Sequence, residues 1–195
     1  KGSIEDYWLF IYSIDDDPYI TGHWTQHEWG TAIGDYMKTS QSAIGNPDGG
    51  TSFFDWTDRP DKLTCANLET MGYSQYDGTY GRKLFYEARG YSVTDCYNQK
   101  TDNNHGGFTL LNFKAEIDAG YPVLLNLQGH SVVGYGYNES TIYIRDTWDS
   151  DPSHIYTMPW GGIYHGMELQ SVSIVHLAGS NLPYKNYIPL IVKWR

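Results

Sequence analysis

His130 and Asp146 are the side chains of this sequence best suited to acid–base chemistry. His130 opens a run typical of a strand, and Asp146 ends the next such run, 16 residues later. Since side chains alternate along a strand, Ile142, Ile144 and Asp146 share one face, and a hairpin brings the His130 strand alongside. A carboxylate held against one imidazole nitrogen leaves the other nitrogen free for chemistry. The alternative is a strand histidine satisfied by its neighbours and an aspartate of a polar turn.

A nucleophile for this pair has to come from the first third of the chain. Gln26 stands six residues before Ala32, which opens a predicted helix within Trp29-Gly30-Thr31-Ala32. This spacing resembles that of papain-like cysteine peptidases, in which a glutamine stands six residues before the cysteine that opens the central helix. The likeness extends over about residues 20–177, and three further stretches resemble the bacterial branch related to bacteriocin-processing peptidases: Glu116 to Val123, Gly129 to Tyr137 and Trp160 to Tyr164.

The resemblance implies a role for each of these residues. Position 32 would be the nucleophile and His130 the general base and acid. Asp146 would orient the histidine, and Gln26 would donate to the oxyanion. A helix N-terminus favours a thiolate and supplies an N–H to the developing oxyanion, which is why the nucleophile belongs there.

Alanine at position 32 carries no thiol. The first interpretation is a deliberate Cys→Ala change that inactivates a cysteine peptidase. The alternative is a natural loss that leaves a pseudopeptidase. In both cases the chain is expected to bind peptides without cleaving them. A third possibility, from another class, is a non-catalytic carbohydrate-binding or adhesion module of a secreted protein.

The resemblance also predicts the geometry around position 32. The imidazole of His130 is expected to bond Asp146 with one nitrogen and to face the Cβ of Ala32 with the other. A cysteine restored at position 32 is then expected to react faster than a free thiol, because the imidazolium favours its anion.

The composition restricts the partners. With 13 Lys and Arg against 23 Asp and Glu, the net charge is −10, and no basic stripe interrupts it. Such a surface repels nucleic acid and anionic membranes, so neither is expected as a partner. No apolar run reaches the ~20 residues that span a bilayer. The expected partner is a peptide or protein substrate. Many Tyr, Trp and Asn with few Lys suggest secretion, and the opening at Lys1 suggests a trimmed end.

The order of the elements predicts an α+β fold in which a helical half packs on an antiparallel sheet half. Helices are expected from Ala32 to Ile44, around Arg82 to Arg89 with Leu84, Phe85 and Ala88 inward, and from about Leu110 to Ala119. Thr109 and Gly120 should cap the last of these. Strands are expected over 122–127, 130–137, 141–148 and 169–177.

Residues 1–177 are expected to form the papain-like peptidase domain, followed by a linker and an apolar tail at 178–195. That tail is too apolar to stay solvated, so it should dock on its own or a neighbouring domain. Cys65 and Cys96 lack metal spacing and are expected to pair if the protein is exported. No cofactor or metal is predicted: a zinc site at His23 and His27 lacks a third ligand, and the acidic stretches at 15–17 and 146–151 lack calcium-loop spacing.

Overall fold

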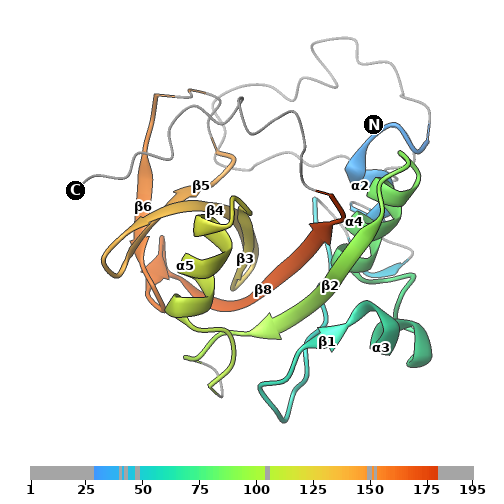
Figure 1. Ribbon diagram of the computed structural model, residues 1–195, viewed down its shortest axis with the longest axis horizontal. Helices are drawn as coiled ribbons and strands as arrows, with labels where there is room; N and C mark the ends of the chain where they lie inside the picture. The colour runs from blue at the N-terminus through green and yellow to red at the C-terminus, as the bar shows by residue number, and fades with distance from the viewer. Residues whose placement is uncertain are drawn as a thin grey trace.

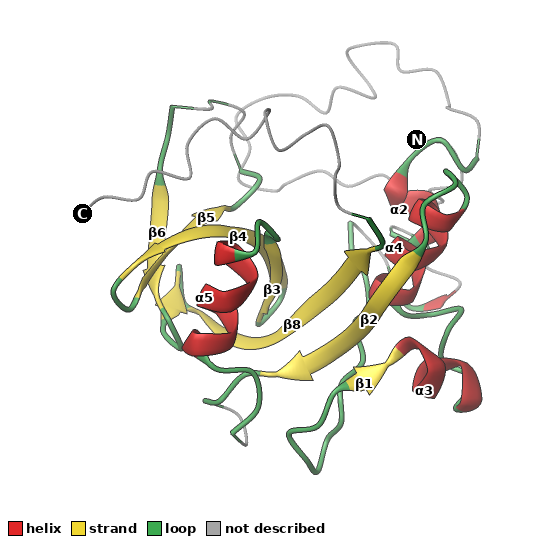
Figure 2. Ribbon diagram, in the orientation of Figure 1, coloured by secondary structure: helices red, strands yellow, loops and turns green. Residues whose placement is uncertain are grey.

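The computed structural model describes residues 29–39, 41, 44–46, 49–103, 106–148, 151 and 153–179 (Figures 1 and 2). Its helices are α2 (Ile33–Tyr36), α3 (Cys65–Thr70), α4 (Gly78–Glu87) and α5 (Leu110–Asp118). Its strands are β1 (Leu63–Thr64), β2 (Val93–Lys100), β3 (Val123–Leu127), β4 (His130–Asn138), β5 (Thr141–Arg145), β6 (Tyr156–Pro159), β7 (Ile163–Tyr164) and β8 (Met167–Leu177). The predicted α+β class is confirmed, although β1 and β2 come before α5 rather than after it. No described helix is long and apolar enough to cross a membrane.

A single antiparallel sheet organises the described chain. Its strands run in the order β1-β2-β8-β3-β4-β5-β6, and β7 pairs with β8 beside this path. The last strand lies between β2 and β3, so it joins the early and late halves of the chain. α4 packs on β2 and β8, whereas α5 packs on β3 and β4. The two helices therefore cover different parts of the sheet (Figure 2).

Helix α5 has the bounds and caps that its sequence predicts. The hydroxyl of Thr109 accepts the backbone N–H of Asn112 at 3.2 Å, and the chain leaves the helix at Gly120 with φ 90°. A left-handed conformation of this kind favours glycine. Phe113 and Ile117 both point into the core, where Phe113 is completely buried.

Strand β4 needs a glycine where it passes under α5. A Cβ added at Gly134 would lie 2.6 Å from Cε2 of Phe113, a distance that real Cβ atoms essentially never show. The close approach lets the phenyl ring fill the space above the strand. It also accounts for one glycine of the Gly-x-Gly pattern in this strand.

Gly134→Ala is therefore expected to lower the free energy of unfolding by about 1 to 3 kcal/mol, because the added methyl overpacks the core. Gly34→Ala is the matched control: its Cβ would meet Thr39 no closer than 3.6 Å. Denaturant unfolding of both variants measures the difference. Equal stabilities would show that β4 and α5 are not packed this closely.

Helix α4 begins earlier than predicted and buries a different face. Asp77 caps it by accepting the N–H of Tyr80 at 2.9 Å, and burial raises the pKa of this carboxyl group. The buried helix residues are Gly78, Thr79 and Gly81, whereas Leu84 is 39% exposed. The prediction that Leu84 and Ala88 point inward was wrong. The small residues are buried because other segments approach the helix closely: Gly78 lies against Thr51 and Phe53, and Gly81 lies against the turn after α2.

Helix α2 is much shorter than the helix predicted from Ala32 to Ile44. It ends at Tyr36, and Lys38 takes a left-handed φ of 58° that breaks the helical path. The turn passes directly over α4: a Cβ at Gly81 would lie 2.6 Å from Cα of Met37. Tertiary packing against α4 therefore overrides the local helical pattern.

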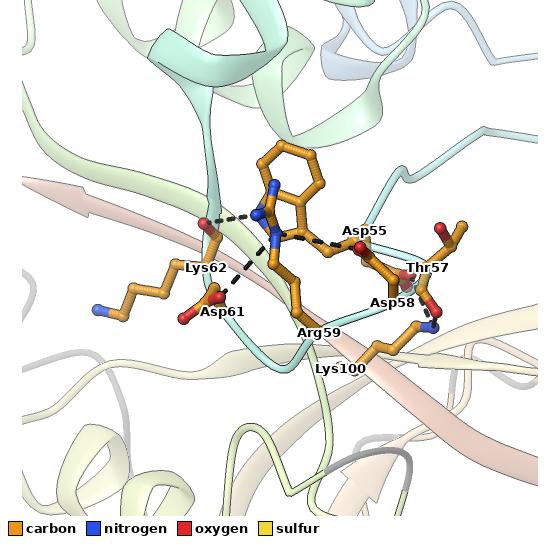
Figure 3. A network of polar contacts seen from close by, with 8 residues as sticks. Asp55, Thr57, Asp58, Arg59, Asp61, Lys62 and Lys100 are labelled. Carbon is orange, nitrogen blue, oxygen red and sulfur yellow. Dashed lines mark hydrogen bonds and ion pairs between the residues drawn. The ribbon is translucent and has the colours of Figure 1, made fainter.

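Cys65 and Cys96 form a disulfide, as predicted for an exported chain, with Cα atoms 5.5 Å apart. It joins the start of α3 to β2, a strand that was not predicted. The preceding loop is tied to β2 as well, because the Nζ of Lys100 donates to the carbonyl of Thr57 at 3.2 Å (Figure 3). Within this loop the guanidinium of Arg59 stacks 3.8 Å above the ring of Trp56. Covalent and polar links together fix this edge of the sheet.

His176 on β8 forms an ion pair that makes stability depend on pH. Its Nε2 lies 2.7 Å from Oε2 of Glu116 on α5, and its Nδ1 lies 3.7 Å from Asp95 on β2. The hydrogen bond to Glu116 is the main reason that the pKa of His176 is raised above its usual 6.5, against the opposing effect of burial.

Since the folded-state pKa is raised, the stabilisation from His176 is fully present below the unfolded-state pKa near 6.5. It is lost as the pH rises through the higher folded-state pKa. We expect the free energy of unfolding to fall as the pH rises over that interval. His176→Gln should remove this pH-dependent part of the stability. A pH series of denaturant unfolding measures it. If the stabilisation lost in His176→Gln instead grew with pH over this interval, the raised pKa of His176 would be contradicted.

Candidate functional site

His130 is the first residue of β4, directly after a two-residue turn. Gly129 in that turn has φ 87°, and Leu127 of β3 is the strand partner of His130. The Nε2 atom of the imidazole lies 2.7 Å from the backbone carbonyl oxygen of Asp146. A carbonyl oxygen only accepts hydrogen bonds, so Nε2 carries the proton. Nδ1 has no hydrogen-bond partner among the described residues, and in the neutral ring it is a base.

Asp146 lies just beyond β5 and is 3% exposed. Its Oδ2 accepts the hydroxyl of Tyr164 at 2.7 Å, and its Oδ1 accepts the backbone N–H of Trp148 at 3.2 Å. The imidazole is therefore bonded by the main-chain carbonyl of Asp146 and not by its carboxylate, which differs from the expected arrangement. The carboxylate turns away because two other donors occupy its oxygens.

Aromatic rings enclose the histidine. The ring of Trp148 stacks on His130 with centroids 4.9 Å apart and planes at 20°. Tyr164 stacks on Trp148 in turn at 5.9 Å, and His165 contacts Trp148 edge-on at 5.2 Å. Trp148 is 39% exposed, so this stack reaches the surface. Sequence reasoning assigned no role to Trp148, Tyr164 or His165, although Tyr164 lies within one of the stretches that resemble the peptidases.

The backbone between Asp146 and Trp148 is strained. Thr147 has φ 69°, a left-handed conformation that is a genuine outlier for a β-branched residue. Conformations of this kind cost about 1 to 3 kcal/mol and persist only where the surroundings impose them. The bond from the Trp148 N–H to the Asp146 carboxylate closes an Asx turn around Thr147, and this turn imposes the conformation.

Ala32 is the residue that precedes α2. Its backbone N–H donates to Oδ2 of Asp35 at 3.1 Å, and the N–H of Gly30 donates to the same oxygen at 2.9 Å. Asp35 is completely buried. The side chain of Arg89 fixes this turn from outside by donating to the carbonyls of Gly30 and Thr31. The N–H that an oxyanion would need at position 32 is thus already bonded to a carboxylate.

The structure brings His130 and Asp146 together, whereas the backbone N–H of Ala32 is bonded to Asp35 within its own turn. α2 packs against α4 at one end of the fold, whereas β4 lies under α5 at the other (Figure 1). Gln26, the expected oxyanion donor, lies outside the described residues, as do His23, His27 and the acidic stretch 15–17. The apolar segment of the tail, within 180–195, also lies outside them. The oxyanion role of Gln26 and the docking of the tail stay predictions.

Thiol chemistry has no nucleophile in these 195 residues. The sequence contains two cysteines, and both belong to the disulfide between α3 and β2. Among the described residues, no three His, Cys, Asp or Glu side chains gather in a way that would hold a metal ion.

The comparison with protein families identifies the class of protein. A model of the Peptidase C39-like family matches residues 19–169, which is well over half of the chain. The chain therefore belongs to this family, which relates it to papain-like cysteine peptidases and agrees with its α+β fold. No curated protein and no solved structure matches the chain.

Proposed function

We propose that this chain is a non-cleaving member of the peptidase family that binds peptides. One observation supports the proposal above all: both cysteines are consumed by a disulfide, so none of the 195 residues supplies a thiol. Covalent catalysis of the papain type requires a thiolate that attacks the peptide carbonyl. Without it, the family's scaffold retains the ability to bind a peptide and loses the chemistry.

The surroundings of His130 support peptide binding. The Nδ1 atom is an acceptor for a peptide N–H, and the partly exposed ring of Trp148 beside it offers an apolar face. Aromatic rings with one exposed face are common anchors in protein interfaces. The net charge of −10 favours peptides that carry Lys or Arg. The disulfide supports an oxidising, extracytoplasmic location.

Two explanations account for alanine at position 32: a natural pseudopeptidase, or a Cys→Ala form of an active peptidase, related to the bacteriocin-processing branch. The bond between the Ala32 N–H and Asp35 favours the natural pseudopeptidase. In an active enzyme that N–H would have to be available to the oxyanion. The native codon at position 32 distinguishes the two explanations.

The experiment is to incubate the chain with a tryptic digest of a denatured protein and to separate bound from free peptides by gel filtration. Mass spectrometry is expected to find retained peptides, enriched in basic residues and unchanged in length after prolonged incubation. Trp148→Ala should reduce the retention, and Trp56→Ala, an aromatic change in a loop beside β2, should not. New peptide termini that accumulate with time would refute the proposal. If no peptide is retained and a parallel incubation with oligosaccharides shows their retention, the result would favour the carbohydrate-binding alternative.

A further inference from the structure

The anchor of His130 depends on a turn that the local chain does not favour. Thr147 is held in a left-handed conformation between Asp146, whose carbonyl bonds the imidazole, and Trp148, whose ring covers it. If this turn relaxes, the carbonyl and the indole both leave the histidine. The side chain that holds the turn therefore controls the histidine without contacting it.

The Asp146 carboxylate holds the turn from inside. Its Oδ1 accepts the Trp148 N–H, which closes the turn, and its Oδ2 accepts the Tyr164 hydroxyl. A buried carboxylate needs such donors, because an ionised group without them is strongly disfavoured away from water. Tyr164 is itself buried, so its hydroxyl is a fixed donor rather than one that solvent replaces.

Tyr164 lies on β7, 18 residues after Asp146 in the sequence. β7 pairs with β8, and β8 lies next to β3, the hairpin partner of β4 that begins with His130. The hydroxyl therefore fixes the turn relative to the same sheet that carries the histidine. The ring of Tyr164 also stacks on the ring of Trp148, with centroids 5.9 Å apart.

We infer that Tyr164 is a positioning residue of this site: through the Asp146 carboxylate, its hydroxyl holds the turn that presents the Asp146 carbonyl and the Trp148 ring to His130. The inference deepens the proposed function and rests on it only in treating His130 as the functional group of the site. The carboxylate acts on the turn, and the main-chain carbonyl acts on the imidazole.

The test is Tyr164→Phe, which removes only the hydroxyl, followed by NMR of the His130 ring in the chain as it exists. In the parent chain we expect an observable Nε2–H signal near neutral pH and upfield-shifted ring protons, since Trp148 stacks on the imidazole. In Tyr164→Phe we expect the Nε2–H signal to be lost to solvent exchange and the upfield shift to fall by at least half. Tyr137→Phe is the matched control, because it removes a tyrosine–aspartate hydrogen bond, to Asp118, at another surface. It should change neither signal.

A second pair of variants keeps the test decisive if Tyr164→Phe does not fold. Asp146→Asn keeps the Asx turn and a hydrogen bond to Tyr164, so it should retain both His130 signals, whereas Asp146→Ala should lose them. Unchanged His130 signals in folded Tyr164→Phe, or their loss in Asp146→Asn, would overturn the inference. These readouts require no bound peptide, so they fail or succeed independently of the peptide-binding experiment.

Discussion

Phe113→Ala is expected to lower the free energy of unfolding by about 3 to 5 kcal/mol, the usual cost of removing a completely buried phenyl ring. The ring fills the space above Gly134, where a glycine leaves no side chain to collapse into the cavity. Relaxation around the void is therefore limited, which places the cost toward the upper part of this range.

Leu111→Ala provides the control for this prediction. Leu111 lies on the same helix and is 76% exposed, so its replacement should change stability by less than about 0.5 kcal/mol. Denaturant unfolding of the two variants gives the comparison. A loss below 1 kcal/mol for Phe113→Ala would show that α5 does not cover β4 as described.

Removing the disulfide by Cys65→Ala together with Cys96→Ala is expected to cost about 3 to 4 kcal/mol. The bridge joins residues 31 apart in sequence, and loop closure of that length accounts for the estimate in the chain-entropy model. Alanine avoids placing a polar hydroxyl in the two buried positions. Since α3 and β1 are short, this edge of the sheet should lose the most stability when the bridge is removed.

Reduction of the parent chain with dithiothreitol provides an independent check on the same quantity. The reduced chain and the double alanine variant should unfold at similar denaturant concentrations. The unreduced, unfolded chain should react with no thiol reagent, because it holds no free cysteine. Labelling of the unreduced chain, or a stability loss under 1 kcal/mol on reduction, would contradict the structure.

The sequence predicted the helices and strands whose ends are set by local caps and turns. Helix α5 followed from its cap at Thr109 and its stop at Gly120, and the β3–β4 hairpin followed from a Gln-Gly turn between apolar runs. Strand β2 was missed because it does not alternate: Cys96, Tyr97 and Asn98 are all buried in succession. The side-chain amide of Asn98 donates to Asp77, the N-cap residue of α4, a contact that no local pattern indicates.

The sequence was sufficient to predict that His130 and Asp146 belong to one site, but not which oxygen of Asp146 bonds the imidazole. The spacing of His130 and Asp146 indicated a pair, and the structure joins them. The choice of the carbonyl over the carboxylate depends on Tyr164, which is 18 residues from Asp146 and reaches it only through the sheet. The placement of Ala32 depends on packing against α4, and a helical pattern contains no information about that contact.

The reactivity of a thiol placed at position 32 tests the proposed function most directly. In the structure the backbone N–H of position 32 bonds the Asp35 carboxylate, and the helix that follows packs against α4. A carboxylate next to a thiol disfavours the thiolate. Ala32→Cys is therefore expected to react with iodoacetamide near neutral pH no faster than a free cysteine, and adding His130→Ala should leave the rate unchanged. Adding Asp35→Asn should raise it. Rapid labelling that His130→Ala slows would contradict the proposed function, because it would show that position 32 faces the histidine and that the chain is a blocked form of an active peptidase.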